Sequence, residues 1–334
     1  MSDTPASANA PAPANAFVET MSARPELMWL FIGIFGLLAT ASIVSFLLKT
    51  FAKKADNKTL ENLQDRINSW WVMIGLLVVA GLLGRTATIT FFAICSFMAL
   101  REFITLSDTR KGDHWSLILM FFVALPVQYW LIGISYYGLY SVFVPVYCFL
   151  LLPVIAALRG DTTRFFERVA KVQWALMICV FCLSHVPALI NLTIPGFGDR
   201  TIMLIVFLLL VVQLSDVMQY VWGKLFGKKL IAPSLSPSKT WVGFLGGVAS
   251  ASLVGASLFW ITPFNPWQAG LISIVITVMG FLGGLVMSAI KRDCGVKDWG
   301  HTIRGHGGFL DRLDSVVFAA PIFFHVTRFF YSTS

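Results

Sequence analysis

The stretch TIMLIVFLLLVVQLSDVMQYVW, residues 201–222, decides the fold class of this chain. An α-helix needs about 20 mostly apolar residues to cross the hydrocarbon core of a bilayer, and this stretch has that length and composition. The same template, moved along the rest of the chain, predicts nine further spans. The ten predicted spans are roughly 27–48, 67–84, 86–106, 115–133, 139–158, 172–190, 201–222, 241–261, 267–290 and 315–331.

The composition of the whole chain agrees with this prediction. Of its 334 residues, 57% are hydrophobic and 13% are charged, whereas an average soluble domain is roughly 45–50% apolar and about 25% charged. These proportions exclude a water-soluble globular protein, a disordered chain and a disulfide-stabilised secreted domain. No sustained alternation of apolar and polar residues indicates a membrane barrel. The predicted fold class is therefore all-α, a polytopic integral membrane protein.

Lys and Arg residues are distributed unevenly over the loops between the predicted spans. Cytoplasmic loops retain these residues, so their distribution predicts the orientation. Of the 25 Lys and Arg residues, 21 lie in the loops after the first, third, fifth, seventh and ninth spans, and four lie on the opposite side. This distribution predicts an N-out, C-out topology, typical of a multi-pass protein of a bacterial inner membrane. It also explains the net charge of +8 without a nucleic-acid partner.

The chain divides into three predicted regions: a tail (1–26), N-terminal transmembrane helices (27–200) and a C-terminal transmembrane region with polar loops (201–334). The tail is rich in Ala, Pro, Ser and Asn and is expected to be disordered. Its first 20 residues contain no Lys or Arg, so no signal peptide is predicted. The five cysteines lack the spacing of a zinc site or a disulfide framework, and they are expected to be buried, unreactive thiols.

The first of two polar cytoplasmic stretches begins at the end of the span at 201–222. Asp216 is a functional candidate, because an acidic side chain in an apolar helix is energetically expensive unless it is paired or bound to a metal ion. The alternative is that Asp216 lies at the membrane interface and pairs with Lys224 or Lys228. Further on, SPSKT at residues 236–240 predicts a turn that opens a helix. There, hydroxyls, free backbone N–H groups and a Lys suit phosphate.

The second polar stretch, residues 288–315, reads SAIKRDCGVKDWGHTIRGHGGFLDRLDS. Its interleaved acidic and basic residues indicate a site for magnesium and polyphosphate, because carboxylates hold the cation while Lys and Arg neutralise phosphate oxygens. Gly307 and Gly308 let the backbone approach a ligand closely, and His306 has a side chain that can transfer a proton. Asp311 and Asp314 are expected at the start of the last helix, on one face, where they could share a metal ion.

Single residues of this stretch have plainer interpretations. Lys291 and Arg292 could anchor the end of a span at the membrane interface, and Asp298 could pair with a neighbouring lysine. Anchoring requires neither a double glycine nor a histidine nor ordered acidic residues, so the plainer interpretations do not explain the stretch as a whole.

The second stretch resembles the signature of the phosphatidate cytidylyltransferases (CDP-diacylglycerol synthases). That signature runs Ser-x-x-Lys-Arg, four residues, Lys-Asp, a Pro-Gly-His-Gly-Gly turn and Asp-Arg-x-Asp. The resemblance extends upstream to Asp216, to the Gly-Lys pairs at 223–224 and 227–228, and to the segment 236–240, so it covers about residues 210–330. The signature positions matched in order and spacing are Ser288, Lys291, Arg292, Lys297, Asp298, Gly305, His306, Gly307, Gly308, Asp311, Arg312 and Asp314.

Two positions depart from the family pattern. Arg304 stands where the family has the Pro of the turn, which changes the turn and adds a positive charge. Gly284 stands where the family usually has an Asp that serves as a metal ligand. The second departure bears on the cation site, which is therefore expected to be rearranged, weakened or lost.

The resemblance implies transfer of a cytidylyl group from CTP to phosphatidate, with CDP-diacylglycerol and pyrophosphate as products, in a catalytic region at 201–334. It also implies Mg²⁺ as the cofactor, with a second, monovalent cation as an option, and a homodimer within membrane lipid. The implied metal ligands are Asp311, Asp314, Asp216 and Asp298. The implied catalytic residues are Lys239, Lys291, Arg292, Asp311 and Arg312. The four basic residues among them would hold the triphosphate and the lipid phosphate, and Asp311 would act through the cations. The implied substrate-binding residues are Ser236, Thr240, Ser288, Lys297, Gly305, His306, Gly307 and Gly308.

Three alternatives stay open from the sequence. Gly284 motivates a catalytically impaired relative that binds lipid or a partner. The same chemistry on another phosphorylated lipid acceptor is equally compatible with the residues. A transporter is disfavoured, because transport sites place polar or helix-breaking residues at bilayer mid-depth in paired halves, whereas the polar residues here gather at the predicted cytoplasmic ends.

Overall fold

The computed structural model describes residues 57–107, 109–300, 302 and 307–333, together with scattered positions between 29 and 45. The predicted tail at 1–26 lies outside the described residues, and so do Arg304, Gly305 and His306 of the second polar stretch. The chain divides into two compact units, residues 1–72 and 73–334. All site residues discussed below belong to the second unit.

Helices make up the regular structure of the described residues, which confirms the predicted all-α class; the extended pairing among them is one isolated bridge between Leu230 and Thr240. The α-helices are α3 (Asn57–Leu82), α4 (Arg85–Thr105), α5 (His114–Leu119), α6 (Leu125–Gly133), α7 (Tyr137–Val142), α8 (Phe149–Ala157), α9 (Phe165–Leu176), α10 (Leu183–Ala188), α11 (Ile202–Phe226), α12 (Trp241–Ser257), α13 (Pro266–Asp293) and α14 (Val316–Tyr331). The short 3₁₀-helical segments are η1 (Lys111–Asp113), η5 (Leu189–Asn191), η6 (Gly198–Thr201), η7 (Phe259–Ile261) and η8 (Leu310–Arg312).

Six helical stretches of the described part are long and apolar enough to cross a membrane. Three shorter apolar helices coincide with predicted spans at 67–84, 241–261 and 315–331. The chain is therefore a multi-pass helical membrane protein, while the count of ten spans and the orientation stay predictions. The six long stretches are Arg85–Thr105, Lys111–Gly133, Tyr137–Ala157, Phe165–Asn191, Ile202–Phe226 and Pro266–Asp293.

Three of these stretches contain a π-helical segment: η2 (Met120–Ala124), η3 (Phe143–Cys148) and η4 (Met177–Cys182). Each segment contains or closely precedes a proline, namely Pro126, Pro145 or Pro187. Proline has no N–H and its ring clashes with the preceding turn, so the regular α-helical hydrogen bonds are interrupted there. Such irregular turns are tolerated at membrane depth where neighbouring helices cover the freed backbone groups.

The turn between α3 and α4 is as tight as the sequence predicts. Helix α3 ends at Leu82 and α4 begins at Arg85, with Gly84 between them at a φ of 94°. This left-handed conformation favours glycine, because a Cβ would be strained there. The expectation of buried thiols holds for three of the five cysteines: Cys95, Cys148 and Cys179 are buried, whereas Cys182 and Cys294 are half-buried, and none of the five forms a disulfide.

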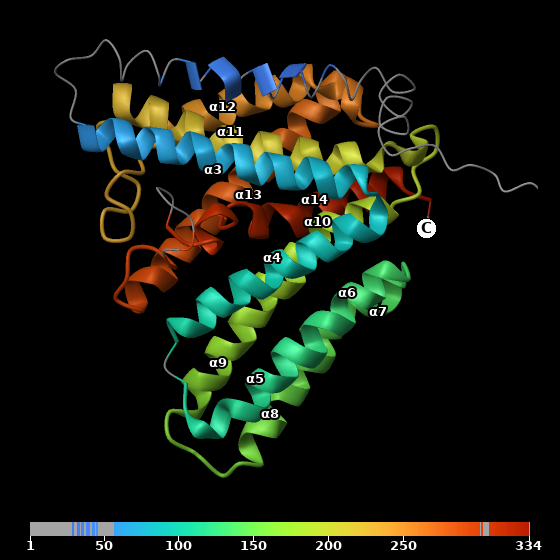
Figure 1. Ribbon diagram of the computed structural model, residues 1–334, viewed down its shortest axis with the longest axis vertical. Coiled ribbons are helices and arrows are strands. Elements are labelled where there is room, and N and C mark those ends of the chain that lie inside the picture. Colours follow the sequence, from blue (N-terminus) through green and yellow to red (C-terminus); the bar gives the residue numbers. More distant parts are fainter. Residues whose placement is uncertain are drawn as a thin grey trace, which may run out of the picture. The chain divides into compact units, whose positions relative to one another are not determined.

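The C-terminal helices pack in sequence, α11 on α12, α12 on α13 and α13 on α14 (Figure 1). Glycine allows the close approach of α11 and α12, since a Cβ on Gly243 would lie 2.6 Å from the carbonyl oxygen of Gln219. Helix α10 packs against both α4 and α14. Helices α4 and α10 are thereby joined to the C-terminal helices.

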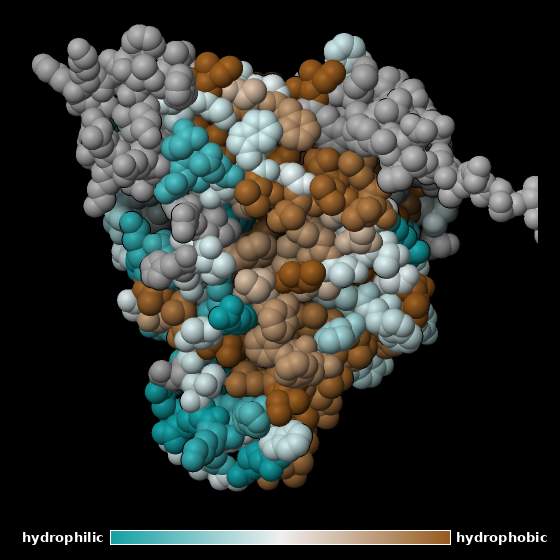
Figure 2. All heavy atoms as spheres, viewed as in Figure 1, coloured by the Kyte–Doolittle hydropathy of each residue, from teal (hydrophilic) through white to brown (hydrophobic). Residues whose placement is uncertain are grey.

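Hydrophobic side chains dominate much of the face shown in Figure 2, while hydrophilic residues gather at the end where α8 leads into α9. Exposed apolar side chains on the helices include Phe122, Leu245 and Leu253. Soluble proteins rarely expose apolar patches of this kind, whereas lipid-facing helices do. The polar end includes loops that the Lys and Arg distribution predicts to be cytoplasmic.

Candidate functional site

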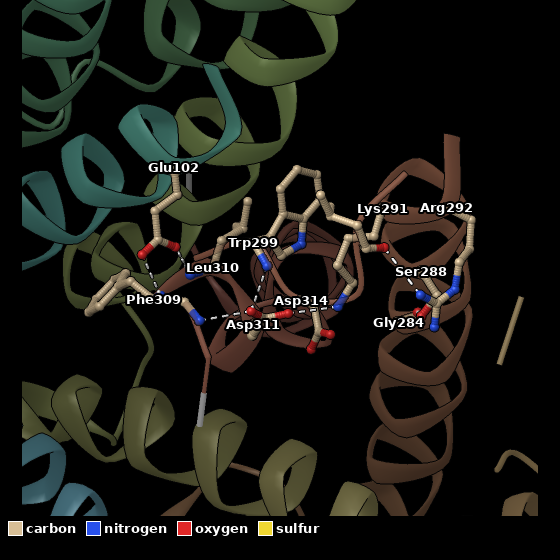
Figure 3. A network of polar contacts seen from close by, with 12 residues as sticks. Glu102, Gly284, Ser288, Lys291, Arg292, Trp299, Phe309, Leu310, Asp311 and Asp314 are labelled. Carbon is tan, nitrogen blue, oxygen red and sulfur yellow. Dashed lines mark hydrogen bonds and ion pairs between the residues drawn. The ribbon is translucent and has the colours of Figure 1, made fainter. Parts of the chain in front are cut away.

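The last turn of α13 and the 3₁₀ segment η8 bring the centre of the second polar stretch together (Figure 3). Lys291 of α13, 8% exposed, donates a hydrogen bond from Nζ to Oδ1 of Asp311 at 2.7 Å. Asp311, also 8% exposed, accepts hydrogen bonds at Oδ2 from the backbone N–H groups of Trp299 (2.8 Å) and Gly308 (2.9 Å). A buried ion pair is tolerated when its remaining lone pairs are satisfied in this way. Asp311 therefore ties α13 to the chain on both sides of the glycine turn.

This arrangement corrects the predicted placement of Asp311 and Asp314. The expectation that both lie at the start of the last helix is wrong, because α14 begins at Val316 and both residues precede it. The N–H groups of Trp299 and Gly308 bind the side chain of Asp311 and hold the chain in a 3₁₀ turn at this point. Asp311 is buried, and both of its carboxylate oxygens accept hydrogen bonds from groups of the protein itself.

Asp314, Asp216 and Lys239 form a second charged cluster, which interacts electrostatically with Lys291 of the first. Burial raises the pKa of Asp314 above its ordinary range, while Lys291 and Lys239 oppose that shift. Burial lowers the pKa of Lys239, and the carboxylates of Asp314 and Asp216 oppose that shift in turn. The cluster therefore combines carboxylates and an ammonium whose opposite charges partly compensate one another.

The ammonium of Lys239 is held against α13. Its Nζ lies 4.8 Å from the centre of the Phe281 ring, and a Cβ added to Gly284 would lie 2.8 Å from the same Nζ. Ser288, one turn further along α13, uses its hydroxyl to donate to the carbonyl oxygen of Gly284 at 2.6 Å. The missing side chain at position 284 thus leaves the space in which the Lys239 ammonium lies.

Asp216 does not form the ion pair with Lys224 that the plainer interpretation expects. Lys224 instead donates from Nζ to the Tyr220 hydroxyl at 3.2 Å. Asp216 interacts electrostatically with Asp314, Lys239 and Arg312. It therefore belongs to the charged cluster of the second polar stretch, although it lies on α11.

The donor set fits a magnesium ion that is bound by few protein ligands. Within the described part of the chain, neither Asp216 nor Asp314 belongs to an ion pair, and no group of three or more His, Cys, Asp or Glu residues is placed to hold a metal ion. Mg²⁺ commonly uses one or two carboxylates together with substrate phosphates and water. Asp216 and Asp314 supply hard oxygen ligands of this kind.

The remaining predicted site residues surround these clusters. Arg292 is exposed and donates to the carbonyl oxygens of Leu235 (3.3 Å) and Val296 (3.1 Å). Arg312 accepts a hydrogen bond at its carbonyl oxygen from Gln213 at 3.1 Å. Lys297 and Asp298 are exposed and Ser236 is half-buried. The structure thus brings together Asp216, Lys239, Lys291, Asp311 and Asp314, while Arg292, Lys297 and Asp298 lie on exposed chain around them.

Thr240 caps α12, as the predicted helix-opening turn requires. Its Oγ1 accepts a hydrogen bond from the N–H of Gly243 at 3.0 Å, and the residue is buried. Side-chain oxygens at this position satisfy one of the backbone donors that the first helical turn leaves unpaired. The hydroxyl oxygen of Thr240 therefore serves to cap α12.

The change Thr240→Val keeps the shape of the side chain and removes the hydrogen-bond acceptor. We expect it to destabilise the protein by about 1 kcal/mol, the usual loss for an N-cap, seen as a fall of the unfolding temperature by a few degrees. Thr240→Ser retains the acceptor and serves as the control, with an unchanged unfolding temperature. A Thr240→Val protein as stable as the parent would contradict the capping role.

Glu102 on α4 is a site residue that the sequence analysis missed. It is 8% exposed and accepts hydrogen bonds at Oε1 from the Thr302 hydroxyl (2.6 Å) and the Phe309 N–H (2.8 Å), and at Oε2 from the Leu310 N–H (2.8 Å). The sequence pattern that singled out Asp216 also applies to Glu102, since both are acidic residues near the end of an apolar helix.

Comparison with known proteins gives matches across most of the chain and others across about half of it. The family model described as "Cytidylyltransferase family" matches residues 64–330. A protein of Escherichia coli (strain K12) named "Uncharacterized protein YnbB" is 39% identical over 305 residues, which is 89% of this chain and 96% of that protein.

Proteins named "Phosphatidate cytidylyltransferase" are similar over a shorter region. The protein of Staphylococcus haemolyticus (strain JCSC1435) is 37% identical over 158 residues, and that of Staphylococcus aureus (strain COL) is 35% identical over 158 residues. In both cases the match covers 46% of this chain and 60% of the relative. The similarity thus spans less than two thirds of the length of the relatives that carry a named activity.

Proposed function

Because this chain belongs to the cytidylyltransferase family, we propose that it transfers a cytidylyl group from CTP to phosphatidate, giving CDP-diacylglycerol and pyrophosphate. The observation that carries the proposal is the pair of charged clusters at the ends of apolar helices. Lys239 and Lys291 offer positive charge, and Asp216 and Asp314 offer carboxylates, within one group of interacting side chains. A nucleotide and a lipid phosphate can meet at such a place, where the acyl chains stay in the bilayer.

The proposed reaction forms a bond between a phosphate oxygen of phosphatidate and the α-phosphorus of CTP, and it breaks the bond from that phosphorus to pyrophosphate. Such a transfer depends on in-line positioning and charge neutralisation more than on covalent help. Lys239 and Lys291 neutralise phosphate oxygens, and the Gly307–Gly308 turn lets backbone approach the nucleotide. Asp216 and Asp314 would hold Mg²⁺, which when bound would neutralise charge that develops on the phosphates.

Pyrophosphate release tests the proposal. The purified, detergent-solubilised protein is given CTP, phosphatidate and Mg²⁺, and each component is omitted in turn. We expect release that needs both substrates and stops when EDTA removes the metal, with CDP-diacylglycerol as the lipid product. Absence of release from folded protein, with an active phosphatidate cytidylyltransferase assayed alongside, would overturn the proposal. The same assay with other phosphorylated lipids identifies the preferred acceptor.

One observation favours a second candidate, a catalytically impaired relative that binds lipid or a partner. Position 284 carries no carboxylate, and the Lys239 ammonium lies where a side chain would begin. If the parent is impaired for this reason, Gly284→Asp creates activity in a protein that had none.

The main proposal makes the opposite prediction for position 284. We expect an active parent, and we expect Gly284→Ala to retain activity within about threefold, because the added methyl group displaces only the flexible end of the Lys239 side chain and makes ordinary contact with the Ser315 hydroxyl. Initial rates of pyrophosphate release measure both variants. A parent that releases no pyrophosphate, together with an active Gly284→Asp protein, would favour the second candidate.

A further inference from the structure

The signature loop, defined here as the described residues 299, 300, 302 and 307–310, is held by α4, a helix of the N-terminal half. Glu102 binds Thr302 on one side of residues 303–306 and binds Phe309 and Leu310 on the other. The partners are 200 to 208 residues away along the chain. One buried carboxylate therefore binds the chain both before and after residues 303–306, and Figure 3 shows its contacts with Phe309 and Leu310.

The fit between Glu102 and the loop leaves no room for larger side chains. A Cβ on Gly300 would lie 3.2 Å from Oε1 of Glu102, and a Cβ on Gly308 would lie 2.6 Å from Oε2. These two glycines let the carboxylate reach the loop backbone.

The neighbouring residue of α4 strengthens this connection. Phe103 stacks on the ring of Trp299, with 4.9 Å between the ring centres. The N–H of Trp299 in turn donates to Asp311, the partner of Lys291. The end of α4 therefore contacts the loop through a carboxylate and an aromatic ring, and both contacts lead to the Lys291–Asp311 ion pair.

We propose that Glu102 is a positioning residue, which sets the conformation of the signature loop and thereby places the Gly307–Gly308 backbone and the Lys291 ammonium for the triphosphate of the nucleotide. The identity of that ligand rests on the proposed function, whereas the positioning of the loop does not. The N-terminal helices thereby contribute to the site, although the signature motifs themselves lie within residues 210–330.

Glu102→Gln tests the proposal with little change of shape. A glutamine side chain has one acceptor oxygen, and its other polar group is an NH₂ donor. In Glu102→Gln this NH₂ group would face a loop N–H group, so at least one of the hydrogen bonds accepted by Glu102 would be lost. We expect amide hydrogen exchange at Phe309 and Leu310 to become at least about tenfold faster, with α11 and α13 protected as in the parent. In the active protein we expect the KM for CTP to rise at least about tenfold and kcat to change by less than about threefold.

Two controls separate positioning from general stability. Glu167→Gln changes a half-buried glutamate of α9 that pairs with Arg164 and Lys171, and it should leave loop exchange and KM unchanged. Gly300→Ala places a methyl group against Glu102, so it should raise the KM for CTP in the parent and add little in a Glu102→Ala background.

Each outcome decides the proposal. Parent-like exchange at Phe309 and Leu310 in Glu102→Gln would overturn it. So would faster exchange spread over α11 and α13, which would show a general structural role. If the parent itself releases no pyrophosphate from CTP and phosphatidate, the proposed function fails, and the exchange experiment alone still decides whether Glu102 holds the loop.

Discussion

Asp311→Asn is expected to reduce pyrophosphate release by at least about 10³-fold and to lower the unfolding temperature. The substitution leaves the buried Lys291 ammonium without its counter-ion, and it places an amide NH₂ where the carboxylate accepts N–H groups. Breaking one side of a buried ion pair costs about 3–5 kcal/mol. The same change disconnects the signature loop from α13, so the groups that neutralise phosphate charge lose their positions.

Two further variants make this expectation specific. Asp293→Asn alters an exposed carboxylate at the end of α13 and should keep both activity and stability. The double change Asp311→Asn with Lys291→Met removes the unpaired charge, and it should recover part of the stability without recovering activity. Differential scanning fluorimetry and initial rates measure the two effects separately. An Asp311→Asn protein with parent-like rates would contradict the role of the ion pair.

Lys239→Met is expected to lower kcat/KM for CTP by about 10²-fold with little change in the unfolding temperature. The ammonium of Lys239 contacts the Phe281 ring and interacts with Asp314 and Asp216, and among the described residues it makes no hydrogen bond. It is therefore placed to bind a phosphate oxygen. Methionine keeps an unbranched apolar chain over the ring and removes the charge.

The matched control for this variant lies on α11. Lys224 is exposed and bonded to Tyr220, so Lys224→Met should leave kcat/KM within about threefold of the parent. Binding of CTP in the absence of lipid, measured by equilibrium dialysis, should weaken in Lys239→Met alone. Equal losses in the two variants would indicate a general effect of positive charge near the membrane and would contradict a specific role of Lys239.

Several features of this protein follow from local sequence. A membrane-spanning helix satisfies its own backbone hydrogen bonds, so the length and apolarity of stretches such as 201–222 suffice to predict it. The Gly84 turn and the cap at Thr240 are also local, because each involves residues within a few positions. The spacing of the signature at 288–314 indicated the family for the same reason, since it lies within a single short segment.

The tertiary structure alone decided which polar groups are used within the protein and which are left for a ligand. Asp311 was expected on the last helix, yet its oxygens bind Lys291 and two backbone N–H groups in a 3₁₀ turn before that helix. Lys239 lies in the space beside Gly284, and Glu102 meets Leu310 across 208 residues of chain. These contacts depend on how helices that are distant in the sequence pack together. The packing decides which donors lie next to a buried carboxylate, and the carboxylate forms its hydrogen bonds with those donors.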